Sequence, residues 1–461
     1  MIRKWIIRWL ISTMILGFVA FVLYNYLYTR ASDGMRIEVL KIVDDMVLQD
    51  DARPILRGLI EEAHDAAFAT SLNIREQLGR KFDGVELQQL EVGAEEWAAA
   101  ESAVDEEILQ AMDDAITRID VFHSAGMPDP LSLETAPGLR CEARYLPISP
   151  VGLYVPGGSA PLISTVLMLA VPARIAGCKE VILCTPPDKE GRVPPAILAA
   201  AVRCGVKRVF KAGGAQAIAA MGLGTESIPA CAKLFGPGNA WVTEAKQQIS
   251  VLPGGAARDM PAGPSEVLVI ADKDADATAV CWDLLSQAEH GPDSQAIVIS
   301  DSPDLLEQVT SLLPGMAEGL PRAAILAESL RYLRRILVDS IAEAVEISNR
   351  YAPEHLILNC QEADQAADSV TAAGSVFIGP WTSESLGDYC SGTNHVLPTY
   401  GYARAYSGLS VSDFLRRMTL QRASNFGLRK VGPCAMTLAL AEGLDAHRMA
   451  VEYRLNIGGG K

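Results

Sequence analysis

From about residue 150 onward the sequence repeats one pattern, in which a short apolar run is followed by a segment with helical spacing. Continuous apolar runs are typical of parallel strands that are buried on both faces, and the helical segments supply the crossovers. The pattern predicts two open, Rossmann-like α/β sheets with ligand-binding loops after the strands. We expect strands at residues 180–185, 207–212, 266–271, 296–300, 335–339, 355–358 and 375–379.

Helical spacing of apolar residues dominates both ends of the chain. The early helical region ends at Gly126, before Pro128 and Pro130, and a helical period returns from about residue 410. We therefore expect a helical segment at 35–54, a first, discontinuous α/β domain from 55–153 with 267–408, a second α/β domain at 154–266, and a helical tail at 409–461.

The N-terminal leader, residues 1–34, contains an apolar stretch without charge at 9–28. At about 1.5 Å per helical residue this stretch spans roughly 30 Å, the thickness of a bilayer core, so it is typical of a transmembrane segment. A cleaved signal peptide is one alternative, and a start at Met35 that leaves the leader untranslated or dispensable is another. Nothing after Met35 is membrane-adapted, so we expect a cytoplasmic catalytic part, with membrane contact only if residues 1–34 are an anchor.

Composition excludes several classes of protein. With 49% hydrophobic and 21% charged residues the 461-residue chain is globular, and its net charge of -16 argues against a nucleic-acid partner. Its nine cysteines include no C-x-x-C pair, so neither a disulfide framework nor a zinc knuckle is indicated, and a reducing cytosol fits.

Glycine clusters mark three loops, at 154–161, 211–220 and 235–242. In the second, an apolar run leads into Gly213-Gly214 and then into a helix, which presents backbone N–H groups and the helix dipole to an anion such as phosphate. The spacing is not G-x-G-x-x-G, however, so the usual dinucleotide fingerprint is absent. Glycines that only turn a strand into a helix explain the motif equally well.

Two Glu-His pairs account for two of the six histidines. His290 follows Gln287 by three residues, so both side chains can face one point, as zinc ligands would. In such a pair, however, the histidine is more often a structural residue held by hydrogen bonds than a metal ligand. Because no H-E-x-x-H motif occurs, any metal site must collect ligands from distant segments.

The second pair, Glu354-His355, opens an expected strand, since Pro353 disfavours helix before it. An adjacent carboxylate and imidazole suit general acid–base catalysis near neutral pH, although a solvated Glu and a capping His remain the alternative. Further candidate ligands are Asp388, Glu442 and His447, whereas His64 and His123 are expected at the surface.

Several long segments together resemble the histidinol dehydrogenase family. They are "VGLYVPGGSAPLISTVLMLAVPARIAGC", "GGAQAIAAMGLGTESIP", "FGPGNAWVTEAK", "DMPAGPSEVLVIAD", "DLLSQAEHGPDSQ", "YAPEHLIL" and "GDYCSGTNHVLPTYGYAR". The resemblance covers essentially Met35 to the C-terminus, with looser agreement at about 55–90 and at 314–334. The hydrophobic leader is foreign to the family.

The resemblance implies a zinc- and NAD-dependent enzyme that oxidises L-histidinol through L-histidinaldehyde to L-histidine with two NAD, ending histidine biosynthesis. The implied catalytic pair is Glu354 and His355. The implied zinc ligands are Gln287, His290, Asp388 and His447. The implied substrate contacts are Ser265, Gln287, His290, His355, Asp388, Glu442 and His447. The implied NAD contacts are Tyr154, Gln216 and Asn239.

The resemblance also implies a homodimer in which the C-terminal tail, with Glu442 and His447, completes the partner's active site. Three other hypotheses stand beside it. The first is a zinc hydrolase with Glu354 as base, which leaves the glycine loops and Asn239 unexplained. The second is a non-enzymatic, membrane-tethered binder of an imidazole compound, and the third is an enzyme that oxidises another amino alcohol.

Overall fold

The computed structural model describes residues 87, 89–157, 161–261 and 263–457. The apolar stretch 9–28 and the helices expected within residues 35–86 lie outside these ranges, so they stay predictions. Within the described ranges, no helix is both long enough and apolar enough to cross a membrane.

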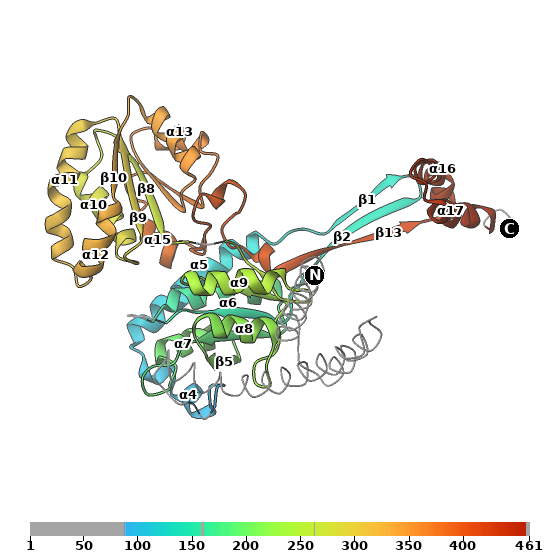
Figure 1. Cartoon of the computed structure of the whole chain (residues 1–461), viewed down its shortest axis with the longest axis horizontal. Helices are drawn as coiled ribbons and strands as arrows, with labels where there is room; N and C mark the ends of the chain where they lie inside the picture. Colours follow the sequence, from blue (N-terminus) through green and yellow to red (C-terminus); the bar gives the residue numbers. More distant parts are fainter. Residues whose placement is uncertain (1–86, 88, 158–160, 262, 458–461) are drawn as a thin grey trace, which may run out of the picture.

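Residues 151–258 contain a five-stranded parallel sheet with the order β5-β4-β3-β6-β7 (Figure 1). The strands are β3 (Val151–Tyr154), β4 (Val181–Thr185), β5 (Arg208–Lys211), β6 (Lys233–Phe235) and β7 (Ala257–Arg258). The central strand β3 is buried along its whole length, as expected for a strand covered on both faces.

Helices cover this sheet and share its core. They are α4 (Ala94–Ala99), the 3-10 turn η2 (Glu101–Ala103), α5 (Glu106–Ala125), α6 (Ile163–Ala176), α7 (Pro195–Arg203), α8 (Gly214–Leu223) and α9 (Ala240–Val251). Helix α5 is capped by Gly126 as predicted and packs on α6, where its buried Leu109 and Ile119 join the core that also contains β3. The division expected from the sequence grouped residues 55–153 with 267–408, whereas in the described residues α4 and α5 join the core of this sheet.

The second sheet is also five-stranded and parallel, with the order β10-β9-β8-β11-β12. Its strands are β8 (Glu266–Ala271), β9 (Gln295–Ser300), β10 (Arg334–Leu337), β11 (His355–Asn359) and β12 (Ser375–Ile378). All seven apolar runs singled out in the sequence are strands, and the predicted fold class of two parallel-sheet α/β domains is confirmed.

Helices lie on both faces of the second sheet (Figure 1). They are α10 (Ala277–Ala288), α11 (Pro303–Glu318), α12 (Ala323–Ser329), η3 (Leu330–Tyr332), α13 (Ile341–Tyr351) and α14 (Ala363–Asp368). A short helix, α15 (Glu384–Tyr389), follows β12. The turns η4 (Tyr402–Arg404) and η5 (Val411–Phe414) then return the chain to the first sheet, where Phe414 stacks on Phe235.

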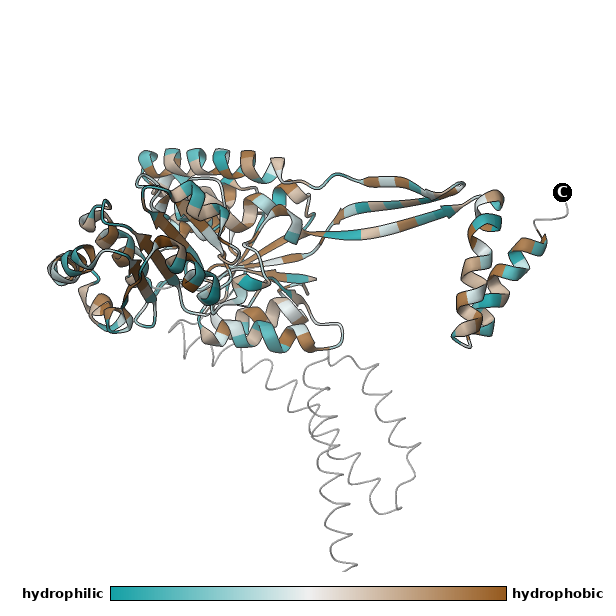
Figure 2. Ribbon diagram, turned by 90° about the horizontal axis from the view of Figure 1, so that it is seen from above, coloured by the Kyte–Doolittle hydropathy of each residue, from teal (hydrophilic) through white to brown (hydrophobic). Residues whose placement is uncertain are grey.

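A third, antiparallel sheet projects away from both domains as an arm (Figures 1 and 2). It consists of β1 (Leu131–Ala136), β2 (Leu139–Pro147) and β13 (Leu415–Ala423), with the helices α16 (Asn425–Ala441) and α17 (Asp445–Ile457) at its end. The helical period expected over residues 415–423 is wrong, because this segment pairs with β2 along its whole length. The tail is helical only from Asn425.

Candidate active site

Glu354 and His355 lie where β11 begins, beside the first residue of β8. Helix α13 ends at Tyr351, its C-cap residue Ala352 adopts the left-handed conformation (φ 58°), and Pro353 then leads directly into the pair. The chain packs so closely that a Cβ on Gly374 would come within 2.5 Å of the Glu354 carbonyl oxygen. Both side chains are buried, which contradicts the alternative of a solvated Glu354 with a capping His355.

The His355 ring is oriented by its neighbours. Its Nδ1 lies 3.1 Å from the carbonyl oxygen of Glu266, which can only accept a hydrogen bond. That contact places a proton on Nδ1 and turns Nε2 toward Asp388, whose Oδ1 is 3.6 Å away. Nε2 is buried and has no hydrogen-bond partner among the described residues, so it is available to a substrate proton.

Four buried carboxyl groups surround this ring: Glu266, Glu354, Glu384 and Asp388. Burial raises the pKa of Glu354 to about 7 and that of Glu384 well above its ordinary value. Burial alone would lower the pKa of His355, but the carboxylates outweigh it and raise the pKa to about 10. Burial opposes ionisation of Asp388 too, yet the nearby histidines lower its pKa. The four carboxyl groups therefore stabilise a positively charged group at the centre of this cluster, whether a protonated histidine or a bound cation.

A potential metal site adjoins the pair. One ligand atom each of His290, Glu384 and Asp388 lies within 4.8 Å of the other two. His290 follows the end of α10, and Glu384 and Asp388 are one turn apart on α15. His290 as a whole is exposed, but the protein around its ring removes water from it and lowers its pKa, which favours the neutral imidazole that binds a metal.

Gln287 lies beside this group on α10 and is buried. With its side-chain nitrogen facing Glu384, the amide donates to that carboxylate and its oxygen accepts from the Glu266 N–H at 3.2 Å. The amide oxygen has a second lone pair, so this contact leaves it able to bind a cation.

The residues fit a divalent cation on two grounds. Imidazole nitrogen with carboxylate and amide oxygen is a donor set that zinc accepts. In addition, Oε2 of Glu266 and Oε2 of Glu384 are buried without a hydrogen-bond partner among the described residues, and a bound cation would give these oxygens a partner and favour their ionised form.

The glycine loops gather at the carboxyl ends of strands in the first sheet. The hydroxyl of Tyr154, at the end of β3, accepts a hydrogen bond from the Gly214 N–H after β5 (2.9 Å). Gln216 lies in the first turn of α8, close enough that a Cβ on Gly214 would meet its Oε1 at 2.9 Å. Asn239 is exposed and caps α9, with its side-chain oxygen accepting from the N–H groups of Trp241 and Val242. These loops can cradle an anionic cofactor at helix N-termini.

The two sheets contribute to the candidate site from opposite ends of their strands. The glycine loops follow their strands, as expected, whereas Ser265, Glu354 and His355 lie at the amino ends of β8 and β11. The expectation that all the chemistry lies in loops after strands is therefore wrong for the second sheet. A contact links the halves, because buried Asn394, beside His395, donates to the Met168 carbonyl of α6 (2.7 Å), the helix that follows the first glycine loop.

Glu442 and His447 lie elsewhere. Both are exposed and belong to the helical end of the arm, far from α15 (Figure 1). Within one chain the structure thus brings Gln287, His290, Glu354, His355 and Asp388 together and leaves these two residues apart.

Sequence reasoning missed three members of the cluster. Glu266 opens an apolar strand, Glu384 opens a short helix, and His395 contacts the Asp388 carbonyl through Nδ1 (2.9 Å). His395 carried a usable signal, because histidine is scarce in this chain. His123, expected at the surface, is buried in α5.

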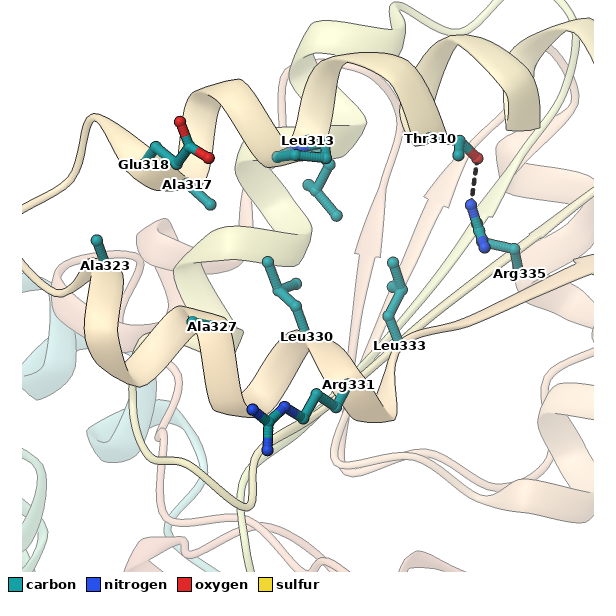
Figure 3. A pocket seen from close by; sticks show the side chains of 11 residues that line it. Thr310, Leu313, Ala317, Glu318, Ala323, Ala327, Leu330, Arg331, Leu333 and Arg335 are labelled. Carbon is teal, nitrogen blue, oxygen red and sulfur yellow. Dashed lines mark hydrogen bonds between the residues drawn. The ribbon is translucent and has the colours of Figure 1, made fainter.

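A separate pocket of about 440 Å³ opens between α11 and α12 (Figure 3). Its lining is mostly apolar and includes Leu313, Leu330 and Leu333. At one side the guanidinium group of Arg335 donates a hydrogen bond to the Thr310 hydroxyl (2.5 Å). None of the cluster residues lines this pocket, so it is not the candidate active site.

Two parallel α/β domains, glycine loops on one and a buried imidazole–carboxylate cluster on the other, define a two-domain α/β enzyme. The histidinol dehydrogenase family model matches residues 50–455. The chain therefore belongs to the histidinol dehydrogenase family and is an oxidoreductase. Histidinol dehydrogenase from Xanthomonas euvesicatoria is 54% identical over 431 residues, covering 91% of this chain and 100% of that protein.

Other relatives agree. Histidinol dehydrogenase from Xanthomonas axonopodis is 55% identical with the same coverage of both chains. The crystal structure of histidinol dehydrogenase from Elizabethkingia anophelis has a TM-score of 0.81 and 43% identity, covering 94% of this chain and 95% of that one. The resemblance noted from the sequence motifs is confirmed.

Proposed function

We propose that this protein oxidises L-histidinol through L-histidinaldehyde to L-histidine, the last steps of histidine biosynthesis, with zinc and two NAD. The observation that carries the proposal is the buried His355 ring, whose Nε2 faces Asp388 without a hydrogen-bond partner among the described residues. An oriented base of this kind suits removal of a hydroxyl proton as hydride departs. Family membership supplies the substrate class.

Zinc would be held by Gln287, His290 and Asp388, together with His447 of a second copy. When bound, it supplies a divalent charge and a fixed geometry that orient the nitrogen atoms of the substrate. Ser265, which immediately precedes β8, would contact the substrate. Glu442 of the second copy would meet the substrate's amino group.

His355 and Glu354 each carry out one of the two proton transfers. A divalent cation at His290 and Asp388 would offset the carboxylate charge that raises the pKa of His355, so that Nε2 would be unprotonated and could take the hydroxyl proton in the first oxidation. Glu354, with a pKa raised to about 7 by burial, removes a proton from the water that attacks the aldehyde, since a base of that pKa is half ionised at neutral pH. Tyr154, Gln216 and Asn239 would hold NAD, which would supply the hydride acceptor for both oxidations.

The arm supports a homodimer with shared sites. Its strands and helices expose large apolar side chains, including Phe426, Leu438, Leu440 and Ile457 at 56 to 63%. An apolar surface on a projecting element is typical of an interface between subunits. Two copies that exchange arms would bury this surface and bring Glu442 and His447 to the partner's cluster.

The test is NADH formation by the purified full-length protein with L-histidinol. We expect two NADH for each histidinol consumed, loss of activity on chelation and recovery with zinc. A single NADH per histidinol would contradict the two-step oxidation. Turnover of a substrate without NAD would instead favour a zinc hydrolase.

A further inference from the structure

Lys246 of α9 and Asp259, which follows β7, form a buried ion pair in the first domain. The ammonium nitrogen lies 2.8 and 2.9 Å from the two carboxylate oxygens. The side chains are only 6% and 2% exposed, so water does not screen this pair. Neither residue belongs to the proposed catalytic or metal-binding groups.

Both members of the pair also bond Gly236, the first residue of the glycine loop after β6. Lys246 Nζ donates to the Gly236 carbonyl at 2.6 Å, and Asp259 Oδ2 accepts from the Gly236 N–H at 2.8 Å. The three hydrogens of the ammonium are thereby all used. The backbone of one residue is fixed at both its donor and its acceptor.

Gly236 needs such fixing. Its φ is +119°, a conformation that other residues rarely adopt, and an added Cβ would lie 2.1 Å from the Tyr154 carbonyl oxygen. The loop therefore passes directly against the strand end that carries Tyr154. Three residues later Asn239 caps α9, the helix that also carries Lys246.

We propose that Lys246 and Asp259 are positioning residues for the cofactor: they hold the 236–239 loop, and Asn239 with it, in the conformation that binds NAD. The inference rests on the proposed NAD site. A buried ion pair is a weak source of stability, because desolvation offsets its attraction, so the pair is better explained by fixing one loop geometry. A loop that is already ordered loses less entropy when the cofactor binds.

The test uses the full-length holoenzyme and the double variant Lys246→Met/Asp259→Leu, which removes both charges together and leaves none unpaired. We expect the Kd and KM for NAD to rise about tenfold, with the KM for histidinol, the zinc content and the kcat at saturating NAD within about twofold of wild type. Lys246→Met/Asp259→Asn, which also leaves no charge unpaired but keeps an oxygen acceptor for the Gly236 N–H, should recover part of the affinity.

Lys233→Met is the matched control. Lys233 lies at the opposite end of β6, is similarly shielded (16% exposed) and donates to the Asp413 carbonyl, away from the glycine loop. It should lower the melting temperature without changing NAD affinity. A folded double variant with wild-type Kd for NAD would overturn the proposal, as would an equal loss of histidinol affinity and zinc, which indicates general damage. If the wild-type protein binds no NAD, the proposed function itself fails.

Discussion

His290 is a proposed zinc ligand and Glu354 a proposed general base in the same cluster. Substituting each residue by itself therefore tests metal binding and proton transfer separately. His290→Asn should lower zinc affinity and activity together, because it removes an imidazole from the group formed with Glu384 and Asp388. Glu354→Gln should retain zinc and slow the aldehyde-to-acid half of the reaction by about 10²- to 10⁴-fold, the usual contribution of a general base. Zinc content by metal analysis, with separate rates from histidinol and histidinaldehyde, checks both. Unchanged activity in either variant would contradict its assigned role.

His123 gives a prediction about stability that is independent of catalysis. Burial lowers the pKa of this histidine, and Asp413 opposes the shift only in part. The unfolded chain, with an ordinary pKa of about 6.5, therefore binds more protons below that pH, and folding stability falls as the pH falls through 6.5. Between pH 6.5 and 5 the loss is at most about 2 kcal/mol, because one proton contributes about 1.4 kcal/mol per pH unit.

The comparison for His123 is His123→Gln, which cannot titrate. Chemical unfolding of both proteins at pH 7.5 and pH 5 gives the two differences in unfolding free energy. The difference should be smaller in the variant, by at most about 2 kcal/mol. Equal pH dependence in the two proteins would show that this histidine is not the titrating group.

At the level of elements, the prediction succeeded where burial leaves a local signature. The strands β8, β9 and β11 have long apolar runs because helices cover both faces of their sheet. Within the part of the chain that the structure describes, no helix layer covers β13. Its exposed Arg416, Arg417 and Arg422 hide the alternation of a strand, so the sequence suggests a helical spacing there. Nothing local in the sequence marks an exposed strand whose partner, β2, lies about 270 residues earlier in the chain.

The same limit applies to the site. Gln287 and His290 were found because a three-residue spacing on a helix places two side chains on one side. Glu384 was missed because it is one acidic residue at the start of a short helix, where acidic residues are common for capping reasons. Its burial, its contact with Gln287 and its place beside His290 depend on the packing of α15 against α10, which is a tertiary contact.

For the whole molecule, the position of Glu442 and His447 on the arm predicts complementation between two inactive variants. In a hybrid dimer of Glu354→Gln and His447→Asn chains, shared sites would give one site carrying both substitutions and one intact site. Random subunit exchange makes half of the dimers hybrids, so about a quarter of wild-type activity should return on mixing.

The control mixture is Glu354→Gln with His290→Asn. Both residues lie in the same cluster of one chain, so every site in that hybrid dimer keeps one of the substitutions. Activity assays after co-expression, with size-exclusion chromatography to confirm dimers, distinguish the cases. No recovery in the first mixture, in dimers of proven hybrid composition, would mean that each site is built within one chain, and the arm would then have to fold back onto its own cluster.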